Sequence, residues 1–107
     1  MRNCELRPNP FAKYIRALHC PTRWTIIRFI GEGKRGTKEI FGFLTANGER
    51  LTPSGLYYHL SELRAAGIIE VVGYREEGGG APEKIWKLKT RTIVIDLLAE
   101  ESRGCFS

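Results

Sequence analysis

The chain has 107 residues, of which 42% are hydrophobic and 27% charged. This balance is typical of a globular protein, and the length fits a single domain over residues 1–107 that would gain from a partner subunit. The formal net charge of +5 and a pI near 9.4 disfavour an acidic partner and favour a polyanion. Because many mildly basic proteins never bind nucleic acid, charge alone does not decide the function.

No run of apolar residues approaches the roughly 20 that a membrane-spanning helix needs. The first residues include Arg2, Glu5 and Arg7, so they lack the apolar centre of a signal peptide. We therefore expect a cytoplasmic protein with no membrane partner.

The three cysteines, Cys4, Cys20 and Cys105, have no CxxC spacing, so the sequence predicts no zinc site. Cytoplasmic thiols are usually reduced, except in hyperthermophiles, and free thiols are the expected state. The alternative is a disulfide that uses Cys4 or Cys105. Both lie near the chain ends, where contacts in a dimer could bring them close to a partner's thiols.

The first expected helix covers about residues 10–19, because Pro10 can begin a helix and Pro21 ends it. Its apolar residues recur at i, i+3, i+4 and i+7, which gives the helix one hydrophobic face. These residues are Phe11, Tyr14, Ile15 and Leu18.

The second expected helix runs from about Pro21 to Glu32. The side chains that it should bury are Trp24, Ile27 and Ile30, with help from Ile26 and Phe29. The segment Gly31–Gly36 is rich in glycine and basic residues, so we expect a loop there.

The third expected helix begins with Thr37 as its N-cap and has Glu39 favourably placed in its first turn. Ile40, Phe43 and Leu44 should face inward, and Asn47-Gly48 should end the helix. One short strand is expected at Arg50-Leu51.

The fourth expected helix spans residues 52–66. Thr52 is a favourable N-cap, Pro53 suits the first helical position, and Gly67 should end the helix. Leu56, Leu60 and Leu63 recur at i, i+4 and i+7 and form its buried side. The opposite side carries Ser54, Gly55, Tyr57, Tyr58 and Ser61. These uncharged, polar or small residues suit a helix that lies against a polar, shaped surface such as the floor of a DNA major groove.

A hairpin should follow, because Ile68–Tyr74 is short and rich in β-branched residues. Lys84–Lys89 is the expected return strand, with Trp86 and Leu88 on its buried side. No helix begins directly after Gly78–Gly80, so we interpret the intervening segment as a turn and not as a phosphate-binding loop.

A last helix is expected at about residues 91–101. Its broad apolar face, like that of the first helix, needs a surface to cover it. Packing both helices against a symmetry mate would provide one, and so we predict a homodimer. The alternative is that both helices fold back onto their own subunit. The predicted interface residues are Phe11, Tyr14, Ile15, Leu18, Ile93, Val94, Leu97 and Leu98.

The resulting fold class is mainly α with a small antiparallel β-hairpin, and the order of elements resembles a winged helix-turn-helix domain. The stretches that resemble ArsR-like transcriptional regulators are Leu18–Arg23 with Ile26 and Ile27, Leu56–Leu60 with Leu63, Ala66–Ile69, and Trp86–Leu88. The hairpin tip, Gly80–Lys84, is also similar to PadR-like repressors. The resemblance covers roughly Leu18–Leu88, which is nearly all of the expected core, residues 18–89, and leaves the two flanking helices for dimerisation.

The resemblance implies a sequence-specific regulator that binds double-stranded DNA as a homodimer. The recognition helix, residues 52–66, would enter the major groove, and the wing, residues 74–84, would lie on the backbone or in the minor groove. The implied DNA-binding residues are Thr52, Ser54, Gly55, Tyr57, Tyr58, Ser61, Lys38, Arg50, Arg64, Arg75 and Lys84. No small-molecule effector can be named from the sequence.

The chain departs from the metal-sensing ArsR pattern. The helix before the recognition helix contains Lys38–Leu44 and has no cysteine pair. We therefore expect no metal and no cofactor, and we do not assign His19 or His59 as ligands.

Two other classes of function remain as alternatives. A winged helix can serve as a protein-interaction module, with Tyr57 and Tyr58 on the contact surface. An enzyme is the more remote alternative, since no nucleophile–base or paired-carboxylate spacing is visible.

Overall fold

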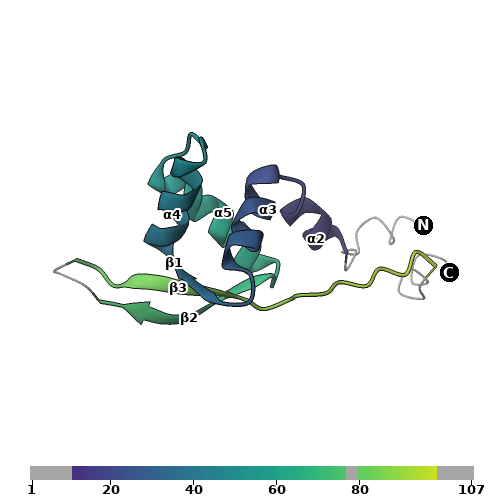
Figure 1. Cartoon of the computed structure of the whole chain (residues 1–107). Coiled ribbons are helices and arrows are strands. Elements are labelled where there is room, and N and C mark those ends of the chain that lie inside the picture. Colours follow the sequence, from purple (N-terminus) through teal and green to yellow (C-terminus); the bar gives the residue numbers. More distant parts are fainter. Residues whose placement is uncertain (1–10, 77–79, 99–107) are drawn as a thin grey trace.

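The computed structural model describes residues 11–76 and 80–98 and shows the winged-helix architecture that the sequence predicts (Figure 1). Within these residues the elements are α2 (Ala12–Ala17), α3 (Pro21–Ile30), β1 (Lys34–Gly36), α4 (Thr37–Ala46), α5 (Pro53–Ala65), β2 (Ile69–Arg75) and β3 (Glu83–Leu88). The predicted recognition helix corresponds to α5, and the predicted wing to β2 and β3.

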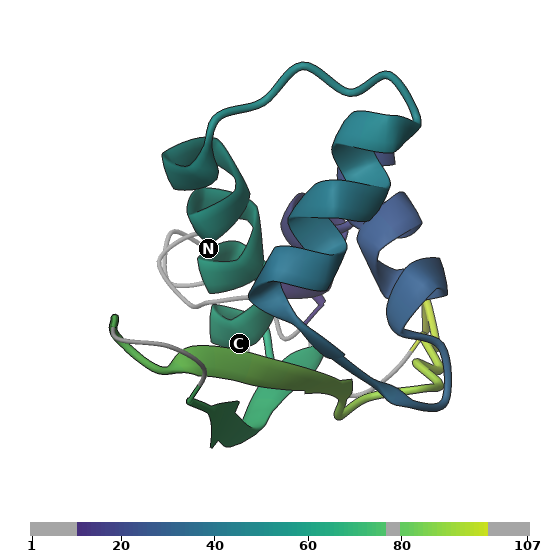
Figure 2. The same ribbon diagram turned by 60° about the vertical axis from the view of Figure 1, so that its left-hand side comes forward.

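The helices α3, α4 and α5 lie on one side of the sheet (Figure 2). The core forms between them, where apolar side chains from each helix meet Trp86 of the sheet. Its fully buried large side chains are Ile26, Ile30, Ile40, Leu44, Leu56, Leu60, Leu63, Ile69 and Trp86. The predicted leucine side of α5 is therefore confirmed.

Local signals set both ends of α5. The Thr52 hydroxyl accepts a hydrogen bond from the Gly55 N–H at 3.0 Å, a cap that contributes about 1 kcal/mol in typical helices. Gly67 follows with φ of +80°, a conformation that L side chains rarely adopt. Both boundary predictions are confirmed.

The sheet has three antiparallel strands in the order β1-β3-β2. The predicted short strand at Arg50-Leu51 is wrong, because the third strand is β1, in the segment expected to be a loop. Strand β1 pairs with β3 through Lys34 opposite Lys87 and Gly36 opposite Ile85. This pairing satisfies backbone groups that β3 would otherwise leave open at its edge.

The N-cap of helix α4 lies one residue before the predicted N-cap, Thr37. The N-cap is Gly36, whose N–H donates to the Glu39 carboxylate at 2.8 Å, and Thr37 is the first helical residue. The Thr37 hydroxyl instead joins the helix to the wing. It accepts a hydrogen bond from the Trp86 indole N–H at 2.9 Å and donates to the Lys84 carbonyl at 3.2 Å.

The inward side of α3 also differs from the prediction. Trp24 is 41% exposed, and its indole N–H donates to the Leu18 carbonyl at 2.8 Å. Arg23 is only 7% exposed and shares the inward side with Ile26 and Ile30. The tryptophan ring thus covers the bend between α2 and α3, and an arginine takes the buried position.

The predicted C-terminal helix is wrong within the described residues. Residues 91–96 have no regular secondary structure and residues 97–98 form a turn, while residues 99–101 lie outside the described part. The run from Thr92 to Ile95 is β-branched throughout, which disfavours a helix. A short helix also needs a packing surface to be stable.

Cys20 has a free thiol, and Cys4 and Cys105 lie outside the described residues. Among the described residues, no helix has the length and apolar character required to cross a membrane.

Candidate nucleic-acid interface

The outward side of α5 carries four residues at i, i+3, i+4 and i+7: Ser54, Tyr57, Tyr58 and Ser61. This spacing places them on one face of the helix, opposite the buried leucines. The tyrosine rings are 50% and 58% exposed, and Ser61 is half-buried. We call this surface the tyrosine face. Its side chains offer hydroxyl groups and aromatic rings without a formal charge.

Lys84 of β3 connects the wing to the tyrosine face. Its ammonium donates a hydrogen bond to the Tyr57 hydroxyl at 2.9 Å and lies 4.8 Å from the centre of the same ring. The hydrogen bond from Lys84, and then its positive charge, lower the pKa of Tyr57. The sequence predicted both residues for DNA contact, and the structure brings them together.

Arg75, another predicted contact, lies between two carboxylates at the base of the wing. Its guanidinium is 3.6 Å from Glu39 and 3.6 Å from Glu83. The Gly36 N–H and then the charges of Arg75 and Arg35 lower the pKa of Glu39. The positive charge of Arg75 is therefore shared within the protein, so it is less available to a phosphate than the sequence suggests.

Glu83, the first residue of β3, caps α4. It accepts a hydrogen bond from the Lys38 N–H at 2.6 Å, and its side chain is only 7% exposed. An acidic group at a helix N-terminus interacts favourably with the helix dipole. Glu83 therefore presents little negative charge to a partner. The two residues are 45 positions apart, so no local pattern predicts the contact.

The remaining predicted phosphate contacts are exposed residues around α4 and α5. Within the described residues, Lys38, Arg50 and Arg64 form no ion pair, and Arg64 lies close enough to Tyr57 to contribute to its lowered pKa. Thr52 is exposed at the N-terminus of α5, and Gly55 is half-buried beside it. Arg64 and Lys84 thus provide positive charge beside Tyr57, and none of the four residues of the tyrosine face is itself charged.

Sequence reasoning did not single out Arg23, which supports α5 from behind. Its Nε–H donates to the Nδ1 of His59 at 3.0 Å, and its guanidinium lies 5.5 Å from the centre of the Tyr58 ring. Burial, and then the positive charge of Arg23, lower the pKa of His59, while Glu49 partly opposes this effect. The spacing of Arg23, Ile26 and Ile30, at i, i+3 and i+7, was the available sign that Arg23 faces inward.

The predicted dimer residues fall into two groups. In α2 and its ends, Tyr14 and Leu18 pack against the core, whereas Ile15 is 61% exposed. In the C-terminal segment, Val94, Leu97 and Leu98 are 81–90% exposed. Phe11 and Ile93 are half-buried. Val94, Leu97 and Leu98 are thus largely exposed in the single chain.

Among the described residues, no group of three or more His, Cys, Asp or Glu side chains could hold a metal ion. His59 is hydrogen-bonded to Arg23 and His19 is exposed.

No protein-family model and no curated protein matches the sequence. Among solved structures, Mycobacterium tuberculosis Rv0081 is similar over 87% of this chain and 74% of its own, with a TM-score of 0.52 and 23% identity. The Vibrio cholerae ferric uptake regulator (Fur), whose crystal structure reveals a rearrangement of its DNA-binding domains, is similar over 67% of this chain and 53% of its own, with a TM-score of 0.49 and 20% identity. At 23% identity the likeness to Rv0081 concerns the fold alone, and the chain's helices and strands have the winged-helix arrangement.

Proposed function

We propose that this chain is a transcriptional regulator that binds double-stranded DNA sequence-specifically as a homodimer. Residues 52–66 would enter the major groove, and residues 74–84 would contact the backbone or the minor groove. The observation that carries the proposal is the exposed tyrosine face of α5, which lies beside a wing lysine and opposite the buried leucines.

The chemistry of the tyrosine face suits base edges. Serine and tyrosine hydroxyls can donate or accept hydrogen bonds, and aromatic rings can contact thymine methyl groups. Thr52 and the Ser54 N–H at the start of α5 suit a phosphate. Since the face itself is uncharged, electrostatic attraction would come from Lys38, Arg50, Arg64 and Lys84 around it.

The homodimer would be formed by the residues with apolar side chains in α2 and in residues 93–98. Ile15, Val94, Leu97 and Leu98 are exposed in the single subunit, and a contact with a second copy would remove them from water. Two recognition helices related by a two-fold axis would then read two half-sites, each in one major groove.

The test is selection of bound sites from random duplexes, followed by an anisotropy titration of the selected site at several salt concentrations. We expect an inverted repeat with half-sites about one helical turn apart, roughly 10 base pairs. Affinity should fall steeply with salt, because phosphate contacts release counterions. Failure to enrich any sequence would contradict specific recognition.

Lys84 offers a matched pair of variants for the wing. Lys84 contacts Tyr57, whereas Lys87 is exposed on the other side of β3. We expect Lys84→Gln to weaken binding to all duplexes and to reduce the salt slope by about one. Lys87→Gln should leave both unchanged. Equal effects of the two variants would argue against a specific wing contact.

A protein-interaction module is the second candidate, and the uncharged character of the tyrosine face favours it. Tyrosine is enriched in the centres of protein interfaces. In that case, any binding to duplex DNA would be weak and indifferent to sequence, and replacing the tyrosines would leave it unchanged.

A further inference from the structure

Arg23 is a buried charge that has no counterion among the residues that the structure describes. It is 7% exposed, and its two hydrogen bonds go to neutral acceptors, the His59 ring at 3.0 Å and the Ala17 carbonyl at 3.3 Å. Within the described residues it forms no ion pair with a carboxylate. A charge removed from water is costly unless a charge of opposite sign compensates it. The position therefore favours an anion.

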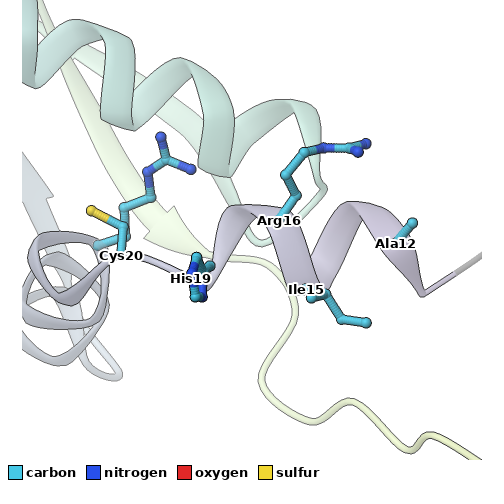
Figure 3. Close-up of a pocket in the computed structure, with 6 residues that line it drawn as sticks. Ala12, Ile15, Arg16, His19 and Cys20 are labelled. Carbon is cyan, nitrogen blue, oxygen red and sulfur yellow. The ribbon is translucent and has the colours of Figure 1, made fainter.

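Arg23 also lines an open hollow at the bend between α2 and α3 (Figure 3). The hollow has a volume of about 550 Å³, within the range of small-molecule sites. Its lining consists of Ala12, Ile15, Arg16, His19, Cys20 and Arg23. Apolar side chains, two arginines and a histidine thus surround it, and no carboxylate is among them.

Part of the Arg23 guanidinium remains available to a ligand. Among the described residues, every fully buried polar side-chain atom has a hydrogen-bond partner. The Nη2 atom of Arg23, which neither the bond to His59 nor the bond to Ala17 uses, is therefore in contact with solvent. Planar N–H groups of this kind match the two oxygens of a carboxylate.

We infer that this hollow binds a small organic anion, with its carboxylate on the Arg23 guanidinium and its apolar body beside Ala12. Arg16, at the rim, adds positive charge. A phosphate of bound DNA is the less suitable occupant, because a phosphate has no apolar body to place against the apolar part of the lining.

The site is connected to α5. The same Arg23 side chain bonds His59 and lies under the Tyr58 ring. An anion that draws the guanidinium toward the hollow would alter the support of the tyrosine face. This consequence rests on the proposed DNA-binding function, whereas binding of the anion itself does not.

The test is calorimetric titration of the full chain, without DNA, with benzoate and with benzyl alcohol as its uncharged counterpart. We expect benzoate to bind at least about tenfold more tightly, because charge-assisted bonds to arginine require the carboxylate. Equal affinity for the two compounds, or no binding of benzoate, would overturn the inference.

Variants locate the site. Arg23→Lys keeps the charge but loses the planar fork, and should weaken benzoate about tenfold. Arg28→Lys, at an exposed position on the same helix, is the matched control and should have no effect. If Arg23→Lys fails to fold, Arg16→Gln at the exposed rim should still weaken benzoate several-fold. Unchanged binding in the folded variants would refute the assignment.

A second titration, of a selected duplex with and without saturating benzoate, separates the two proposals. Benzoate binding without a change in DNA affinity would refute the coupling to α5 and leave the anion site standing. If the unchanged chain does not bind benzoate and Arg16→Gln loses affinity for DNA, the hollow contacts DNA. That result would overturn the anion site.

Discussion

Helix α5 and residues 91–98 are both amphipathic in sequence, yet only α5 is folded by its own subunit. Helix α5 has a capped start, a glycine stop and three leucines that are at most 1% exposed. Residues 91–98 have no helix, and Leu97 and Leu98 are 88% and 90% exposed. The difference teaches that an apolar pattern becomes structure only where the fold supplies a surface to cover it.

The largest expected effect comes from the buried side of α5. Leu60 is completely buried, so Leu60→Ala should lower the free energy of unfolding by about 2–5 kcal/mol. Leu97→Ala is the matched control, because Leu97 is exposed, and its effect on an isolated subunit should stay within about 0.5 kcal/mol. Urea unfolding at low protein concentration measures both. Similar losses would mean that residues 91–98 are packed after all.

Substitutions on the tyrosine face should reduce DNA binding and leave the stability of the fold nearly unchanged. Replacing Tyr57 and Tyr58 together with Ala should abolish binding to a selected duplex while leaving the fold intact, since both rings are exposed. The variant loses the cation–π contact between Tyr58 and Arg23, so we expect its free energy of unfolding to fall by only about 1 kcal/mol. Anisotropy and thermal unfolding give the two values. Unchanged affinity would refute the assignment of this face to the groove.

A second variant at the same positions distinguishes the contribution of the tyrosine hydroxyl groups to DNA affinity from that of the aromatic rings. Replacing Tyr57 and Tyr58 with Phe should keep contacts with thymine methyl groups and lose the hydrogen bonds. A partial loss of affinity is therefore expected from this control.

Truncation after Arg91 tests whether residues beyond the sheet serve only association. It retains the bonds from Lys89 and Thr90 to the Ile68 carbonyl, at 2.8 and 3.1 Å. We expect monomers by light scattering with the stability of the subunit preserved. A dimer that persists would exclude the removed residues as a required part of the interface.

The smallest effect concerns the support of α5 by the Arg23–His59 bond. The pKa of His59 is lowered in the folded chain, so the unfolded chain binds more protons as the pH falls through about 6.5. Stability should therefore decrease below that pH. His59→Gln keeps an acceptor for Arg23 and does not titrate, so its stability should lose this component of the pH dependence. An identical pH profile for both proteins would contradict this role.

The sequence predicts α5 and the hairpin well because their signals are local. Thr52-Pro53, the leucine spacing and Gly67 all lie within one short stretch, and the strands follow directly. Strand β1 was missed because its stability comes from pairing with residues about 50 positions away. Its own composition, rich in glycine and charge, resembles that of a loop.

The candidate site was predicted in its residues but not in its contacts. The exposed positions on α5 follow from helical spacing alone. The links from Arg23 to His59 and from Glu83 to Lys38 join positions 36 and 45 apart. Such pairs depend on the tertiary fold, so one sequence could not have shown that Arg23 supports α5 or that Glu83 caps α4.

The Thr37 hydroxyl has a consequence for the geometry of any complex. Through one oxygen, the first turn of α4 holds both the indole and a backbone carbonyl of β3. These two hydrogen bonds fix the distance between the start of α4 and strand β3. In the proposed complex with DNA, the wing would keep its position relative to the helices, and a duplex that did not fit this arrangement would have to deform.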